Sequence, residues 1–112
     1  MSSTESSSTR RPLVLVHGLW DTPHLFRRLV HRLEAHDVPL LVPHLPHRLG
    51  AVPLSTLAHQ LDAHIRERWG DDMEIDLLGF SMGGIIGRVW LQQCGGARRT
   101  HRFVSVGSPQ RG

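Results

Sequence analysis

The stretch Ile75–Gly84, which reads IDLLGFSMGG, decides the fold of this chain. Its first half is apolar and predicts a buried strand, and apolar residues at helical spacing follow it. Ser81 lies between the two, in the pattern Gly-x-Ser-x-Gly. A sharp strand-to-helix turn holds such a serine in a strained backbone conformation that exposes its hydroxyl, and the flanking glycines avoid a collision. We therefore predict that Ser81 is a nucleophile and that the turn requires Gly79 and Gly83.

The helix that follows the serine adds a second chemical feature. Its first N–H groups, beginning with that of Met82, point toward the place where the oxygen of a tetrahedral intermediate would become negative. A glycine-rich turn that only allows close packing of helix and strand is the alternative interpretation. A dinucleotide fingerprint is excluded because Gly-x-Gly-x-x-Gly is absent, and a Walker loop is excluded because the chain has no lysine.

Strands and helices alternate along the rest of the chain. Continuous apolar runs predict strands at residues 12–18, Val38–Val42, Met73–Gly79 and Arg102–Val106. Apolar residues at helical spacing predict helices at Pro23–Ala35, Leu54–Trp69 and residues 82–94. Pro39 favours an edge position for the second strand. This order predicts an α/β fold, a partial doubly wound parallel sheet of about four strands and three helices.

Three segments together resemble the α/β-hydrolase superfamily, and within it the lipase and esterase branch. Residues 15–20, LVHGLW, are similar to the strand that leads to the oxyanion hole in that family. Residues 79–84, GFSMGG, resemble its nucleophile elbow, and residues 106–112, VGSPQRG, resemble the segment after its next strand. The resemblance runs from about Leu13 to Gly112 and implies a sheet of the α/β-hydrolase type.

The resemblance also implies a chemistry. Ser81 would attack the carbonyl of a carboxylic ester and form an acyl-enzyme that water then hydrolyses. Gly18 would let the backbone turn so that the amide of Leu19 joins that of Met82 in the oxyanion hole, with a plain strand-to-helix loop as the alternative. The implied substrate is a small-molecule ester or a lipid, and no metal or organic cofactor is implied. Thioesterases and acyltransferases share the same elbow, so both activities stay open.

The sequence departs from the family at the catalytic acid and base. In the family, Asp or Glu and then His follow the serine along the chain. Here no Asp or Glu follows Ser81, and the only later histidine is His101, at the predicted start of a strand. Phe80 and Gln110 also stand where the family often has His. We expect a truncated hydrolase in which residues 12–112 form the N-terminal part of the domain and the triad Asp and His are not identifiable. A catalytically inactive domain, an incomplete gene product, or a separate chain that supplies both groups are the alternatives.

Composition and charge narrow the classes of protein to which the chain could belong. The 112 residues, 39% hydrophobic and 21% charged, suit one globular domain. A net charge of only +3, with no basic block longer than two residues, argues against nucleic-acid binding. Residues 1–11 are polar and are expected to be disordered.

Since neither a signal peptide nor a membrane-length apolar stretch occurs, we expect a cytoplasmic protein without an integral membrane segment. Cys94 is the single cysteine, which excludes an intrachain disulfide, and the histidines lack metal-site spacing. Nothing indicates the oligomeric state.

Overall fold

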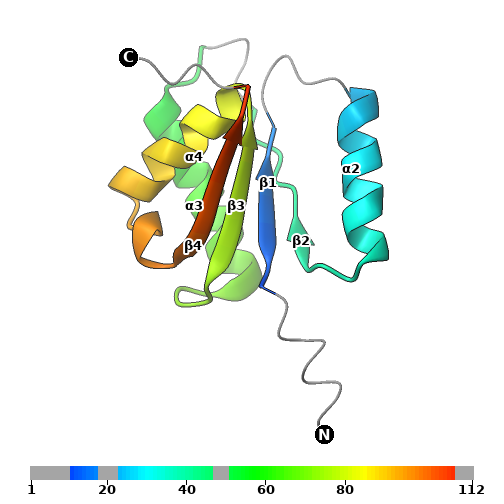
Figure 1. The fold of residues 1–112 in the computed structure, drawn as a ribbon. Coiled ribbons are helices and arrows are strands. Elements are labelled where there is room, and N and C mark those ends of the chain that lie inside the picture. The colour runs from blue at the N-terminus through cyan, green and yellow to red at the C-terminus, as the bar shows by residue number, and fades with distance from the viewer. Residues whose placement is uncertain (1–10, 18–22, 47–50, 108–112) are drawn as a thin grey trace, which may run out of the picture.

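A single parallel sheet organises the molecule (Figure 1). The computed structural model describes residues 11–17, 23–46 and 51–107. Its sheet has four strands in the order β2-β1-β3-β4. The strands are β1 (Leu13–Val16), β2 (Leu40–Leu41), β3 (Ile75–Phe80) and β4 (Thr100–Val106). All three neighbouring pairs are parallel, which confirms the predicted α/β class.

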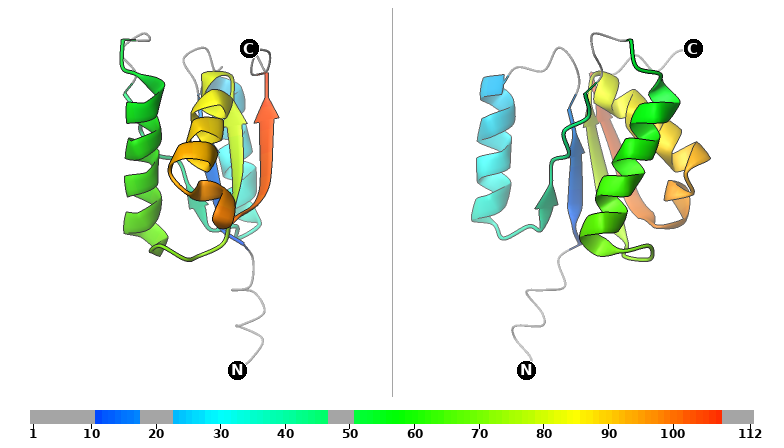
Figure 2. Two further views of the ribbon diagram at one scale, coloured as in Figure 1. Left: turned by 90° about the vertical axis from the view of Figure 1, so that its left-hand side faces the viewer. Right: turned by 180° about the vertical axis from the view of Figure 1, so that it is seen from behind.

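Three α-helices connect the strands and lie on both sides of the sheet (Figure 2). They are α2 (Pro23–Ala35), α3 (Leu54–Trp69) and α4 (Met82–Gln93), and a short 3₁₀ helix, η2 (Gly96–Arg98), follows the last of them. Helices α3 and α4 pack against each other on one side, and α2 lies on the other side beside β1 and β2. None of these helices is long and apolar enough to cross a membrane, as far as the described residues go.

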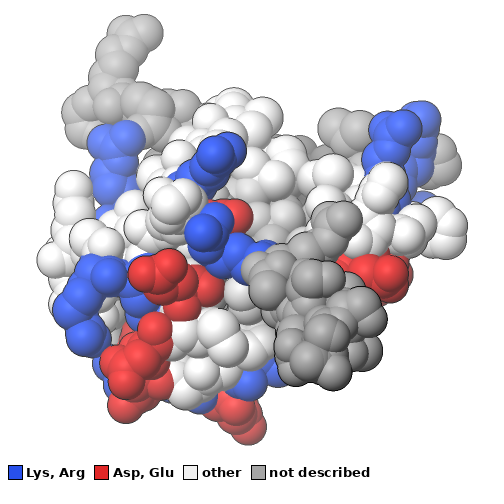
Figure 3. All heavy atoms as spheres, turned by 60° about the horizontal axis from the view of Figure 1, so that its bottom comes forward, with Lys and Arg blue, Asp and Glu red and all other residues white. Residues whose placement is uncertain are grey.

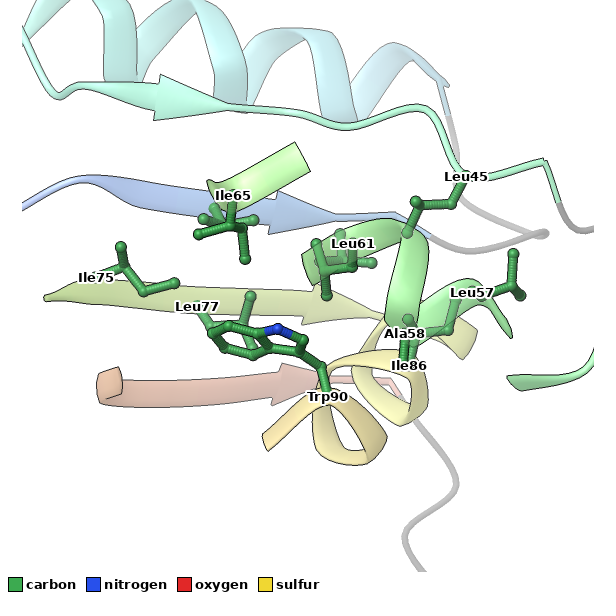
Figure 4. Packing of buried hydrophobic residues seen from close by; sticks show 11 residues of the cluster. Leu45, Leu57, Ala58, Leu61, Ile65, Ile75, Leu77, Ile86 and Trp90 are labelled. Atoms are coloured by element: carbon green, nitrogen blue, oxygen red, sulfur yellow. The ribbon is translucent and has the colours of Figure 1, made fainter. Parts of the chain in front are cut away.

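The core lies between the sheet and the pair of helices α3 and α4 (Figure 4). Alternate strand residues point to this side, because successive side chains of a strand face opposite ways. The fully buried side chains here come from all of these elements and include Val14, Val16, Leu57, Leu61, Ile65, Ile75, Leu77, Ile86 and Trp90. Each of the larger ones contributes about 1.5–3 kcal/mol by leaving water. This packing fixes α4, and therefore its N-terminus, against the strands.

A hydrogen-bonded chain of side chains joins the two core helices. The indole Nε1 of Trp90, on α4, donates to Asp62 on α3 at 2.9 Å. Arg66 donates to the other oxygen of Asp62 at 2.7 Å and also to Asp71 at 2.7 Å. The fully buried indole therefore has its polar group satisfied, as buried tryptophans require.

Several strands begin or end at other residues than predicted, because hydrogen bonds to residues distant in the sequence determine where each strand begins and ends. The second strand is only Leu40–Leu41 instead of Val38–Val42, because Pro39 has no N–H to donate and offers only its carbonyl, which accepts from Leu13 at 2.8 Å. The third strand begins at Ile75 instead of Met73, since the Met73 carbonyl accepts a hydrogen bond from the Arg99 side chain. The fourth strand begins two residues early, at Thr100.

Candidate active site at the carboxyl ends of the strands

Ser81 occupies the single-residue junction between β3 and α4. Its backbone has φ 52° and ψ −126°, a left-handed conformation that an L-residue adopts at a cost of about 1–3 kcal/mol. Two hydrogen bonds hold it there: its N–H donates to the Val106 carbonyl at 2.9 Å, and its own carbonyl accepts from Gly84 at 2.9 Å. The hydroxyl makes no capping hydrogen bond with the helix. The predicted sharp turn is therefore present.

The two predicted glycines lie where no side chain fits. A Cβ on Gly79 would come within 2.5 Å of the Gly84 Cα and 2.7 Å of the Gly83 carbonyl oxygen. A Cβ on Gly83 would collide with the carbonyl oxygen of Val16 and lie 2.6 Å from its carbon. All of these atoms belong to the backbone and cannot rotate away. Glycine at these positions therefore lets the first turn of α4 lie directly against β3 and the end of β1.

The N-terminus of α4 supplies the first predicted oxyanion donor. Met82 is the first residue of α4, so its N–H has no acceptor within the helix and lies at the positive end of the helix dipole. The side chain of Met82 is half-buried against the core, which anchors this residue. The second predicted donor, Leu19, and the loop glycine Gly18 lie outside the described residues. The contact of Gly83 with the peptide of Val16 and His17 nevertheless places the end of β1 beside the turn.

His17 and His101 are candidate bases for Ser81, and of these two only His17 lies near it. Because Val16 pairs with Gly79, His17 follows β1 at the level of the last residue of β3, and it is half-buried. His101 is the second residue of β4, five positions before Val106, to which Ser81 bonds. At ~3.3 Å per residue, these five positions correspond to ~16 Å. His101 is thus at the opposite end of the sheet and cannot take a proton from Ser81.

The described carboxylates lie along α3 or toward the opposite end of the molecule. Asp71, Asp72 and Glu74 lie in the turn before β3, and Asp76 is its second residue, paired with Arg11 at 3.6 Å. Figure 3 views this end and shows acidic and basic side chains interleaved there. Within the described ranges, no three His, Cys, Asp or Glu side chains come together as metal ligands. The described residues therefore bring a serine and a helix N-terminus together but add no carboxylate to them.

Comparison with known proteins places this geometry in a family. A family model of palmitoyl protein thioesterase matches residues 12–112. The chain belongs to this family. Its fold is also similar to that of an extracellular α/β-hydrolase from a Paenibacillus species, with a TM-score of 0.69 and 23% sequence identity. That hydrolase is described as sharing structural and functional homology with tobacco salicylic acid binding protein 2. No curated protein sequence matches the chain.

Membership of the palmitoyl protein thioesterase family confirms the predicted resemblance to α/β-hydrolases. The match to the Paenibacillus hydrolase covers 88% of this chain and 40% of that protein, so the chain spans less than half of its length. Within the superfamily, the matching model names thioesterases, one of the activities that the sequence left open beside lipases and esterases.

Proposed function

We propose that this chain carries the nucleophile of a serine hydrolase of carboxylic esters, with acyl thioesters as its preferred substrates. The observation that carries the proposal is the backbone of Ser81, at φ 52° and ψ −126° on the turn between β3 and α4. The family match to thioesterases supports the choice of thioester over oxygen ester. Oxygen esters of small molecules or lipids remain the second substrate class, because the same turn serves both.

In the proposed reaction, the Ser81 hydroxyl oxygen attacks the acyl carbonyl carbon while a base takes its proton. The carbonyl oxygen becomes negative in the tetrahedral intermediate and accepts hydrogen bonds from the amide of Met82 and from the predicted second donor, Leu19. One such donor contributes about 3 kcal/mol to the transition state. The C–S or C–O bond then breaks, the leaving group takes the proton, and water hydrolyses the acyl-enzyme. A thiol, with a pKa of about 8.5, leaves more readily than an alcohol.

The proposed reaction needs a base that accepts the proton of the Ser81 hydroxyl. His17 is one described imidazole at the level of the turn, and His101 is excluded by its distance along β4. A triad enzyme that lacks its base still retains about 10³–10⁴-fold catalysis over water from the oxyanion hole and binding. We therefore expect the 112-residue chain alone to react slowly, with negligible steady-state turnover.

The experiment is prolonged labelling with a fluorophosphonate, followed by peptide mass spectrometry. The adduct is expected on Ser81 and on no other serine, and it is absent from Ser81→Ala. Alongside it, acylation of Ser81 by a palmitoyl thioester and by p-nitrophenyl butyrate is followed for both proteins. The thioester is expected to acylate Ser81 faster, and neither substrate is expected to give appreciable steady-state turnover. His101→Ala is the matched control and should label as the unmodified chain does, whereas His17→Ala should label more slowly. An adduct on another serine, or turnover that survives Ser81→Ala, would refute the assignment of the nucleophile.

A further inference from the structure

Helix α2 carries a basic surface that the proposed chemistry does not use. Arg27, Arg28 and Arg32 are all exposed, and Glu34 is the acidic residue of this helix. None of the three arginines forms an ion pair with a described carboxylate. Arg66, in contrast, is bonded to two carboxylates. The positive charge on α2 is therefore not neutralised by the described part of the chain.

Part of this surface is hollowed. An open depression of about 650 Å³ is lined by Arg28, Leu29, His31, Arg32, Ala35 and His36. Among the described residues that line it there is no carboxylate. Arg28 and Arg32 are four positions apart and so project from the same face of the helix. A guanidinium donates two parallel hydrogen bonds to the oxygens of a phosphate, and two of them one turn apart suit a row of phosphate groups.

Packing does not account for these charges. None of the side chains described on α2 is fully buried, and none belongs to the main core cluster. The half-buried apolar residues Leu29, Val30 and Leu33 lie on the other side of the helix from Arg27 and His31, as an amphipathic surface helix requires. In Figure 3 a group of basic side chains stands at the upper right, with acidic side chains below it, away from the mixed acidic and basic area at the left. Arg27 and Arg28 lie in the second turn of α2, toward the end of the molecule that holds Ser81.

We propose that this basic face of α2, formed by Arg28 and Arg32 beside the depression that they line, docks on an anionic lipid surface. The face is open and extended along the helix instead of enclosing a single ion, which matches an array of lipid phosphates. Arginines near an anionic bilayer each contribute to binding, and the attraction decays within a Debye length. Docking through α2 goes beyond the proposed hydrolysis and does not depend on Ser81.

The test is co-sedimentation of the full chain with vesicles of phosphatidylcholine alone or with 30% phosphatidylserine. Binding is expected to the anionic vesicles only and to be lost in 0.5 M NaCl. Arg28→Gln/Arg32→Gln should weaken partitioning about 30-fold, which is about fivefold for each of the two arginines. The matched control, Arg98→Gln/Arg102→Gln, removes the same charge from exposed residues of η2 and β4 and should bind nearly as the unmodified chain does. Circular dichroism checks that both variants fold.

Three outcomes would overturn the proposal. The first is no preference for anionic vesicles, and the second is an equal loss of binding in both arginine pairs, which would indicate net charge without a defined face. The third is thermal stabilisation by inorganic phosphate that Arg28→Gln/Arg32→Gln abolishes, with no vesicle binding, which would indicate a site for a soluble anion. Ser81→Ala should bind vesicles normally, so a failure of docking and a failure of the proposed function are distinguishable.

Discussion

Replacing Gly83 by alanine tests whether α4 must touch β1 for the turn to form. The added Cβ would meet the carbonyl oxygen and carbon of Val16 and would lie 3.1 Å from the carbonyl carbon of His17. Since these are backbone atoms at the end of a central strand, α4 must move away from β1 to relieve the contact. Overpacking of this kind costs about 1–3 kcal/mol, and a rigid backbone neighbour favours the upper value. Alanine regains about 1 kcal/mol of helix propensity, so the expected net loss of unfolding free energy is about 2 kcal/mol.

Gly87→Ala is the matched control because it adds the same methyl group to the same helix. Its Cβ would lie 3.1 Å from Leu77 and 3.1 Å from Phe103, in both cases from side-chain atoms that can shift. The same gain in helix propensity should leave its unfolding free energy near that of the unmodified chain. Urea unfolding followed by tryptophan fluorescence measures both variants, and phosphonate labelling of Ser81 should be lost in Gly83→Ala alone. Equal stability of the two variants, with equal labelling, would refute the argument that Gly83 allows this close contact.

Two further predictions concern the α3–α4 interface. Trp90→Phe removes the donor to Asp62 and leaves an aromatic ring buried. Because the lost hydrogen bond is to a charged group, we expect the unfolding free energy, measured in urea, to fall by about 1.5–3 kcal/mol. The control variant Trp69→Phe should lose less. Burial first, and the charge of Asp62 second, raise the pKa of the Cys94 thiol. The rate of iodoacetamide alkylation should therefore rise only at a pH above that of an ordinary thiol, since the thiolate reacts. Asp62→Asn should move that midpoint to lower pH, and an unchanged midpoint would contradict the role of the carboxylate.

Local signals predicted the helices well and the strand ends less well. Leu54–Trp69 was predicted with its observed bounds because Gly70, with φ 79°, provides a helix stop that is visible in sequence. The start of β3 was not predictable from its own residues. It depends on Arg99, whose carbonyl accepts from Ile75 and whose side chain bonds the Met73 carbonyl. The predicted edge position of the second strand is confirmed, because β2 lies at one end of the strand order in the described sheet. Strand β4 lies at the other end, and there Val104 is 51% and Val106 is 43% exposed.

The candidate site was likewise predictable only where its geometry depends on neighbouring residues in the sequence. The turn at Ser81 was predictable because its geometry is encoded within five consecutive residues, Gly79 to Gly83. The contact between Gly83 and the end of β1 joins segments far apart in the chain, and only the sheet order brings them together. His101 was already predicted at the start of a strand, which in a parallel sheet is the end away from the turn. The register of β4, which pairs Val106 with Phe80, confirms that position.

The strain at Ser81 bears on the choice between an active hydrolase and an inactive domain of the same fold. Glycine would adopt φ 52° without the steric cost that a serine bears there. The surrounding structure nevertheless holds the serine in this conformation through backbone hydrogen bonds to Val106 and Gly84 and through two glycines that leave no room for a side chain. A domain that served only as a scaffold would gain stability by relaxing this turn, since the strained residue costs free energy and the glycines weaken strand and helix. The arrangement is accounted for if the Ser81 hydroxyl takes part in a reaction, and this supports the proposed hydrolase over the inactive domain.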